Sequence, residues 1–249
     1  MNKQNNVASI SDSKLGLLPP LTPDNIEFVE KEVKEDLTYG DKGNGRELKT
    51  FFLNHKENTD RDVILYKILL IDYTNSTQLQ RHKKDFSIFA LADRLLAMKN
   101  LDEDIKRGDI SLVRKISKQP VVYPRSNVSA VSEESSEQRK EINLLSFASK
   151  FCHYHNRICY GKDDYSIFDH VVAFAITKKY LPEATTSEID YFRKNSMYEE
   201  YHNLITRIIT KYNDLGQVEN IRNKLDHFLW YPNKKYYYNK NKYKDSFSF

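Results

Sequence analysis

The sequence predicts an all-α protein whose helices form two lobes. Apolar residues recur at intervals of three and four through most of the chain, which is typical of helices with one buried face. No segment alternates apolar and polar residues over the length of an ordinary strand, and the best strand candidate is the short PVVYP at 120–124. A polar, serine-rich linker or surface loop at 117–140 divides the helical segments. We therefore expect one lobe at 21–116 and a second at 141–232.

The first lobe follows an N-terminal stretch, 1–20, that lacks periodicity and is expected to be mobile. Thr22, Pro23 and Asp24 predict a helix start, because they supply a capping hydroxyl, a proline at the first position and an acid near the positive end of the helix dipole. Gly108 is expected to separate the last two helices. The helical segments of this lobe are 25–37, 46–56, 60–79, 86–101 and 109–116.

The second lobe is expected to contain four helical stretches and to be followed by a basic tail. Gly216 is expected to end the third stretch. The tail at 233–249 holds five lysines and one aspartate, which equals the net charge of +4 of the whole chain. Lysines interleaved with tyrosines suit nucleic acid, so Lys234 and Lys235 are DNA-binding candidates, the alternative being a solvated terminus. The four stretches are 141–155, 166–181, 187–216 and 218–231.

Composition excludes several classes of protein. Charged residues make up 30% of the chain, and no apolar run reaches the roughly 18 residues of a membrane span. Two cysteines do not form a disulfide framework, and the N-terminus has no hydrophobic core of a secretory signal. We therefore expect a cytoplasmic protein with no membrane partner.

One lysine and one aspartate stand out by their surroundings. Lys150 lies in NLLSFASKFCHYHN, between small and aromatic residues, and Asp169 opens the apolar run DHVVAF nineteen positions later. In a continuous helix Lys150 would lie beside Phe147 and Tyr154, where desolvation favours the neutral amine that a nucleophile needs. The plainer alternatives are a solvated surface lysine and an aspartate that caps a helix.

The same residues resemble the helix-hairpin-helix DNA glycosylases, and most closely the 8-oxoguanine glycosylase (OGG) branch. In that family a Leu-Pro-Gly-Val-Gly-Thr-Lys hairpin precedes an aspartate in a Val-Pro-Val-Asp segment. Here NLLSFASK has Ser146 and Ala148 at the two glycines, Ser149 at the threonine and Lys150 at the lysine, and YSIFDHVV has Asp169 at the aspartate. The chain is also similar to compact bacterial OGG-fold proteins with a Ser-Lys-aromatic-x-His-x-His stretch, some encoded near phage-defence genes.

This resemblance, which covers roughly Lys67 to Trp230, implies a two-lobed glycosylase fold with a degenerate hairpin, after which Lys150 starts a helix. It implies a DNA glycosylase, with or without AP-lyase activity, that needs no cofactor. Lys150 would attack C1′ of a nucleotide flipped out of double-stranded DNA, and an ionised Asp169 would stabilise the developing positive charge. The setting would be antiviral defence, with other defence proteins as partners, or DNA repair.

Further DNA-binding candidates lie around this pair. By the resemblance, Ser146, Ala148 and Ser149 would lie at a DNA phosphate, and Asn75 in TNST would fill the gap left by the extruded base. The alternative for Asn75 is a helix end capped by polar side chains. His153 and His155 are expected to flank the cleft and contact DNA, the alternative being that they pair with acids.

No metal site is predicted, because Cys152, His153, His155 and Cys159 lack the spacing of a structural zinc site. Asp163 and Asp164 are expected to be solvated.

Two other functions remain open on the sequence. One is a non-catalytic nucleic-acid or protein-binding module of a defence system that keeps the glycosylase fold. The other is an enzyme that uses Lys150 on a different substrate, such as a free nucleotide or a modified protein.

Overall fold

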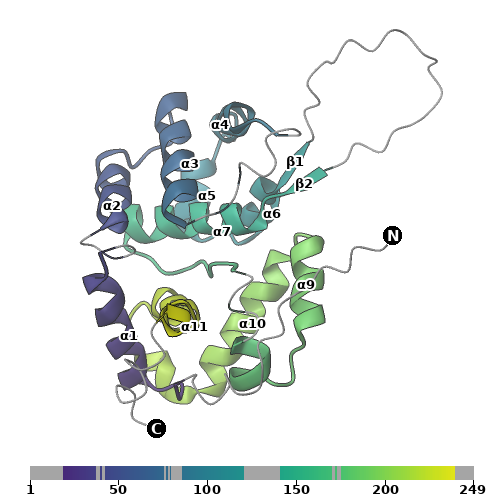
Figure 1. Ribbon diagram of the computed structural model, residues 1–249. Coiled ribbons are helices and arrows are strands. Elements are labelled where there is room, and N and C mark those ends of the chain that lie inside the picture. The colour runs from purple at the N-terminus through teal and green to yellow at the C-terminus, as the bar shows by residue number, and fades with distance from the viewer. Residues whose placement is uncertain are drawn as a thin grey trace, which may run out of the picture.

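The protein is predominantly helical, as the sequence predicts (Figure 1). The computed structural model describes residues 19–37, 40, 43–75, 77, 79, 86–120, 141–169, 172 and 175–238, except for the side chains of Lys178 and residues 233–238. The expected N-terminal stretch, most of the serine-rich linker and the end of the basic tail lie outside these residues. No helix among the described residues is long and apolar enough to cross a membrane.

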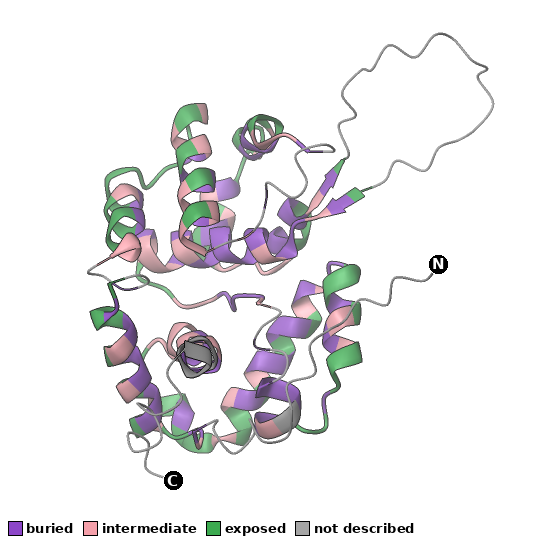
Figure 2. Ribbon diagram, viewed as in Figure 1, coloured by how far each residue is buried: buried purple, intermediate pink, exposed green. Residues whose placement is uncertain are grey.

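One group of helices surrounds a central buried helix. The central helix is α7 (Leu145–Tyr154), whose residues 145 and 147–153 are all buried (Figure 2). Helices α3 and α6 pack directly on α7, and α2 and α4 pack on α3. The other members of this group are α2 (Asn44–Asn54), α3 (Arg61–Asn75), α4 (Ile88–Leu96), α5 (Leu101–Arg107) and α6 (Ser111–Ser117).

A second group of helices brings together the first and the last helix of the described chain. Helix α1 (Pro23–Glu35) packs along α11 (Ile221–Tyr238), and α9 (Thr186–Lys194) packs on α10 (Tyr198–Lys211). Figure 1 places these four helices together, across from the group around α7. The expected segment 21–116 is thus divided in space, since its first helix lies with helices of the 141–232 segment. Apolar side chains of α1, including Ile26, Val29 and Val33, are buried in this arrangement.

Several helix ends follow from local chemistry. The Thr22 side chain accepts a hydrogen bond from the Asn25 backbone N–H, and proline follows at the start of α1, as predicted. Gly108 ends α5 with φ of 77°, a left-handed conformation that favours glycine. Thr185 and Glu188 form a reciprocal capping box at the start of α9.

Other boundaries differ from the expectation. The segment 86–101 breaks after Leu96, so α4 and α5 are separate helices. The segment 187–216 breaks at Ser196, whose φ is 53°. Helix α10 ends at Lys211, where the backbone of Tyr212 leaves the helical conformation, and Gly216 falls in a short 3₁₀ helix, η6 (Asn213–Gln217). The predicted end at Gly216 is therefore wrong. Helix α11 runs through Pro232 into the expected tail.

A two-stranded ribbon lies directly before 144–150, the segment in which the hairpin was expected. Strands β1 (Lys118–Pro120) and β2 (Glu141–Asn143) pair antiparallel, and the Leu144 backbone N–H donates to the Ser117 carbonyl at 2.8 Å. These contacts join the end of α6 to the start of α7, and the two helices pack on each other. Of the predicted strand PVVYP only Pro120 is described, and it lies in β1.

Candidate functional site

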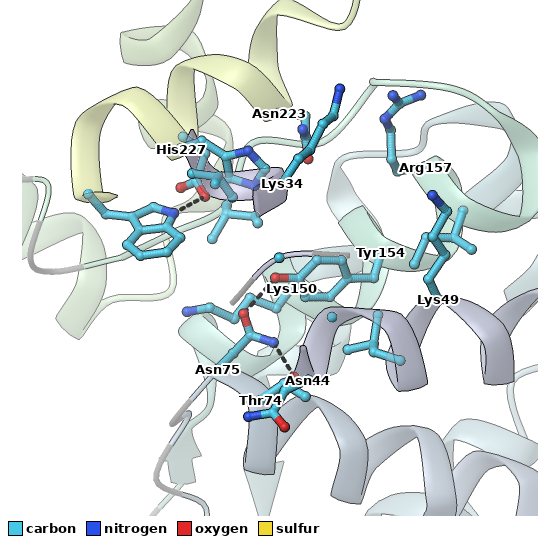
Figure 3. A pocket seen from close by; sticks show the side chains of 18 of the residues that line it. Lys34, Asn44, Lys49, Thr74, Asn75, Lys150, Tyr154, Arg157, Asn223 and His227 are labelled. Carbon is cyan, nitrogen blue, oxygen red and sulfur yellow. Dashed lines mark hydrogen bonds between the residues drawn. The ribbon is translucent and has the colours of Figure 1, made fainter. Parts of the chain in front are cut away.

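The candidate site is a pocket of about 320 Å³ between the two groups of helices. Its wall is formed by α1, α2, the end of α3, α7, the π-helix η3 (His155–Cys159), residues 167 and 169, and α11. Figure 3 shows the side chains that line it. Lys150, Asp169 and Asn75, which the sequence singles out from separate segments, all line this one pocket.

Lys150 lies inside helix α7, which begins five residues earlier at Leu145. The expectation that Lys150 starts a helix after a turn is therefore wrong. Ser146 and Ala148 are ordinary helical residues, because side chains with a Cβ rarely adopt the positive φ that the glycine hairpin needs. Lys150 Nζ donates to Ser146 Oγ at 2.9 Å, one helical turn away, and the Lys150 side chain is only 5% exposed.

The carboxylate of Asp169 lies next to this amine. Lys150 Nζ and Asp169 Oδ2 are 3.6 Å apart, and the Asp169 side chain is 30% exposed. Asp169 follows an extended segment that crosses the molecule, and two of the buried hydrogen bonds that hold this segment lie next to Asp169. The Phe168 N–H donates to Ser149 Oγ at 3.0 Å, and the Tyr201 hydroxyl donates to the Ile167 carbonyl at 3.0 Å. Ser149 thus positions Asp169 from within α7, a role that the sequence did not indicate.

Asn75 joins the end of α3 to the pocket. The Tyr154 hydroxyl donates to Asn75 Oδ1 at 2.5 Å, and Asn75 Nδ2 donates to Thr74 Oγ1 at 2.6 Å. Figure 3 shows Asn75 and Tyr154 beside Lys150. Asn75 is the last residue of α3, and it lines the pocket that also holds the candidate catalytic pair.

Asp226 is a site residue that the sequence analysis missed. It lines the pocket from α11, is 8% exposed and accepts a hydrogen bond from Trp230 Nε1 at 3.1 Å. Burial raises the pKa of Asp226 to about 7; the charge of His227 works against this rise and the charge of Asp169 adds to it. The position could have been found from the run LDHFLW, where an acid interrupts the apolar face of a helix.

An ion pair between α1 and α11 lies on the same wall. His227 Nδ1 and Glu30 Oε2 are 2.6 Å apart, and Lys34 Nζ lies 3.3 Å from Glu30 Oε1. Burial alone would raise the pKa of Glu30, but the hydrogen bond and charge of His227 together with Lys34 lower it to about 2. Burial alone would lower the pKa of His227, but Glu30 and Asp226 raise it. Both shifts favour the charged forms of the two side chains.

The two histidines expected at the DNA surface are interior residues that do not line the pocket. His153 bonds the Tyr165 carbonyl and Asn223 Oδ1 through its two ring nitrogens. His155 bonds the Lys56 carbonyl and Asn58 Nδ2. Burial is the main cause that lowers the pKa of His155 to about 3, and the charge of Lys67 adds to this effect. The ring is therefore neutral at neutral pH. Both rings are buried with both nitrogens bonded, and the DNA contact expected of them stays a prediction.

The loop acids are not solvated as expected. Asp163 accepts the backbone N–H groups of Arg222 and Asn223 at the start of α11, and Asp164 accepts from Asn156 Nδ2. Both carboxylates thus tie the loop to helices.

Among the described residues, no three His, Cys, Asp or Glu side chains converge as a metal site would require. Ala148 is fully buried, and Lys234 and Lys235 lie on α11 with side chains outside the described set.

The fold and this site define a helical protein with a buried lysine–aspartate pair in a pocket. The family model HI_0787_N, described as an N-terminal domain, matches residues 25–159, which is more than half of the chain. The protein belongs to this family. The match includes Asn75 and Lys150 but ends before Asp169 and Asp226. No curated protein and no solved structure matches the chain.

Proposed function

We propose that the protein is a DNA glycosylase that excises a modified or damaged base, with Lys150 as the nucleophile and Asp169 as its carboxylate partner. The observation that carries the proposal is the buried amine 3.6 Å from a carboxylate, inside a pocket large enough for a small ligand. Most lysines are solvated, and burying one beside an acid carries a desolvation cost. Such a pair in a pocket is therefore a candidate functional site.

The chemistry of the pair suits base excision. The neutral Lys150 amine attacks C1′, the bond from C1′ to the base nitrogen breaks, and the base leaves with that electron pair and takes up a proton. The amine attached to C1′ then forms a Schiff base with the opened sugar, from which β-elimination can cleave the strand. Asp169 stabilises the positive charge that develops on the sugar as the base departs.

The rest of the pocket suits a flipped nucleotide. The Trp230 ring offers an aromatic face, and the Asp226 carboxyl offers a polar group beside it. Asn75 lies at the pocket with an amide that can approach the opposite base. The extrusion of the base is required because C1′ cannot be reached inside the stack.

We further propose that the fold is a two-lobed helix-hairpin-helix glycosylase fold in which the ribbon β1–β2 replaces the hairpin. The support is that α6 and α7 pack together and are joined by the Leu144–Ser117 bond at the base of the ribbon. The setting would be antiviral defence or DNA repair, with double-stranded DNA as the partner and other defence proteins as additional candidates.

The test is borohydride trapping on duplexes that each carry one modified base. We expect a covalent protein–DNA adduct with the wild type, loss of the adduct with Lys150→Gln, and a fall of at least a hundredfold in base release with Asp169→Asn. Lys150→Gln should still bind the duplex. If no duplex gives base release or an adduct, and Lys150→Gln keeps the biological activity, the protein is the non-catalytic binding module instead.

A further inference from the structure

The pocket carries more positive charge than the candidate catalytic pair explains. Lys34 from α1, Lys49 from α2 and Arg157 from η3 line the same pocket as Lys150. Figure 3 shows these three side chains on the side of the pocket away from the Lys150 amine. Two consecutive helices, α1 and α2, and the sequence-distant η3 therefore each contribute one cation to one wall.

The pocket is lined by more cationic side chains than carboxyl groups. The cations are Lys34, Lys49, Lys150 and Arg157, and the carboxyl groups are Glu30, Asp169 and Asp226. Glu30 contacts both Lys34 and His227, and Asp169 lies 3.6 Å from Lys150. The gathering of cations at this wall favours an anionic ligand group.

Burial is graded along the pocket in the way a nucleotide requires. Lys150 and Asp226 are buried at its inner part, whereas the Lys34 side chain is 56% exposed and Lys49 is exposed at its rim. An extruded base and its sugar carbon belong in the inner part, and phosphates keep their charge at the water-exposed rim.

We propose that Lys34, Lys49 and Arg157 form a phosphate subsite that holds a backbone phosphodiester next to the extruded nucleotide. The subsite deepens the proposed glycosylase function and rests on it. It takes over the phosphate contact that backbone N–H groups of a glycine hairpin would make, since Ser146 and Ala148 are inside a helix here. Asn223 lies beside Lys34 and adds an amide group.

The experiment measures DNA binding by the Lys150→Gln protein, which has no nucleophile, so that binding is separated from chemistry. The probe is a duplex with one tetrahydrofuran abasic-site analogue, titrated at several salt concentrations. We expect added Arg157→Gln or Lys49→Gln to weaken binding about tenfold and to make the salt slope less negative by about 1. Lys211→Gln, an exposed cation of α10 paired with Glu183, is the matched control and should change neither quantity.

Two further arms identify the phosphate. Replacing the phosphate next to the analogue by a neutral methylphosphonate should weaken binding, and Arg157→Gln should then cost little more. A free nucleoside 5′-monophosphate should bind far more weakly than the duplex. The proposal is overturned if the Lys150→Gln protein does not bind the duplex, if the slope is unchanged in both variants, or if the free nucleotide binds more tightly.

These outcomes are distinct from failure of the glycosylase proposal. A phosphate effect without base release or trapping by the wild type would keep the subsite and reject the glycosylase. Trapping through Lys150 with an unchanged salt slope would keep the glycosylase and reject the phosphate subsite.

Discussion

The buried carboxyl of Asp226 should make the stability of the protein depend on pH near neutrality. Its pKa is raised from 3.8 to about 7, mainly by burial. Between these pH values the folded protein holds a proton that the unfolded chain releases. The free energy of unfolding therefore falls as pH rises from about 4 to about 7, and the full cost of the buried charge is present above that range.

The magnitude follows from the size of the shift. A difference of about three pH units corresponds to at most about 4 kcal/mol, at 1.36 kcal/mol for each unit. Asp226→Asn has nearly the same shape, cannot ionise and keeps an oxygen that accepts from Trp230. We expect the variant to be about 2–4 kcal/mol more stable than the wild type at pH 8 and nearly equal to it at pH 4.5.

The assay is urea unfolding followed by circular dichroism at pH 4.5, 6 and 8. The difference between wild type and variant reports this carboxyl together with its effect on His227, because the remaining titrating groups are common to both proteins. Asp214→Asn, at an exposed position on η6, is the control and should show no such difference. A stability gap between wild type and Asp226→Asn that stays constant from pH 4.5 to 8 would refute the reasoning.

Three further predictions concern other buried or constrained positions. Burial lowers the pKa of Lys67 from 10.5 to about 8. Between these pH values the unfolded chain binds more protons than the folded protein, so the free energy of unfolding should rise by about 3 kcal/mol as pH increases through them. Lys67→Met should remove this rise in urea titrations at pH 7.5 and 10. Gly108→Ala should lower the melting temperature more than Gly161→Ala does. Both glycines have a positive φ, but only the Cβ at 108 would lie 2.8 Å from the Asp164 side chain. Equal losses in the two variants would contradict this. Ser149→Ala should lower the free energy of unfolding by about 1–3 kcal/mol, because it leaves the Phe168 N–H without its acceptor. It should also reduce borohydride trapping, although Lys150 is intact. Unchanged trapping would show that Asp169 is positioned by other contacts.

The features that the sequence predicted correctly depend on neighbours along the chain. A capping threonine before a proline, or a glycine after the last apolar residue of a helix, acts through the backbone of its own segment. Thr22 and Gly108 therefore lie at helix ends as expected. The proximity of Lys150 and Asp169 came from the resemblance to glycosylases, since their separation of nineteen residues does not by itself fix a distance.

The features that the sequence did not predict depend on long-range packing. Asp226 faces the pocket because α11 packs on α1, and no local pattern states which helices meet. Strands of three residues, as in β1 and β2, are too short to give a period-2 pattern. The start of α7 at Leu145 was missed because the glycine-based alignment imposed a turn on Ser146 and Ala148, which propagate a helix instead.

The packing of α1 on α11 has a consequence for the order of folding. Hydrogen-bonded partners on these helices, such as Glu30 and His227, are 197 residues apart in sequence. Helices around α7 can associate while the chain is still being synthesised, but α1 has its partner only after nearly all of the described chain has left the ribosome. The wall that carries Glu30 and Lys34 is thus the last part of the pocket to form, and a nascent chain holds Lys150 without an enclosed cavity around it. A contact of this length also carries a large loop-closure entropy, which makes its formation a slow step.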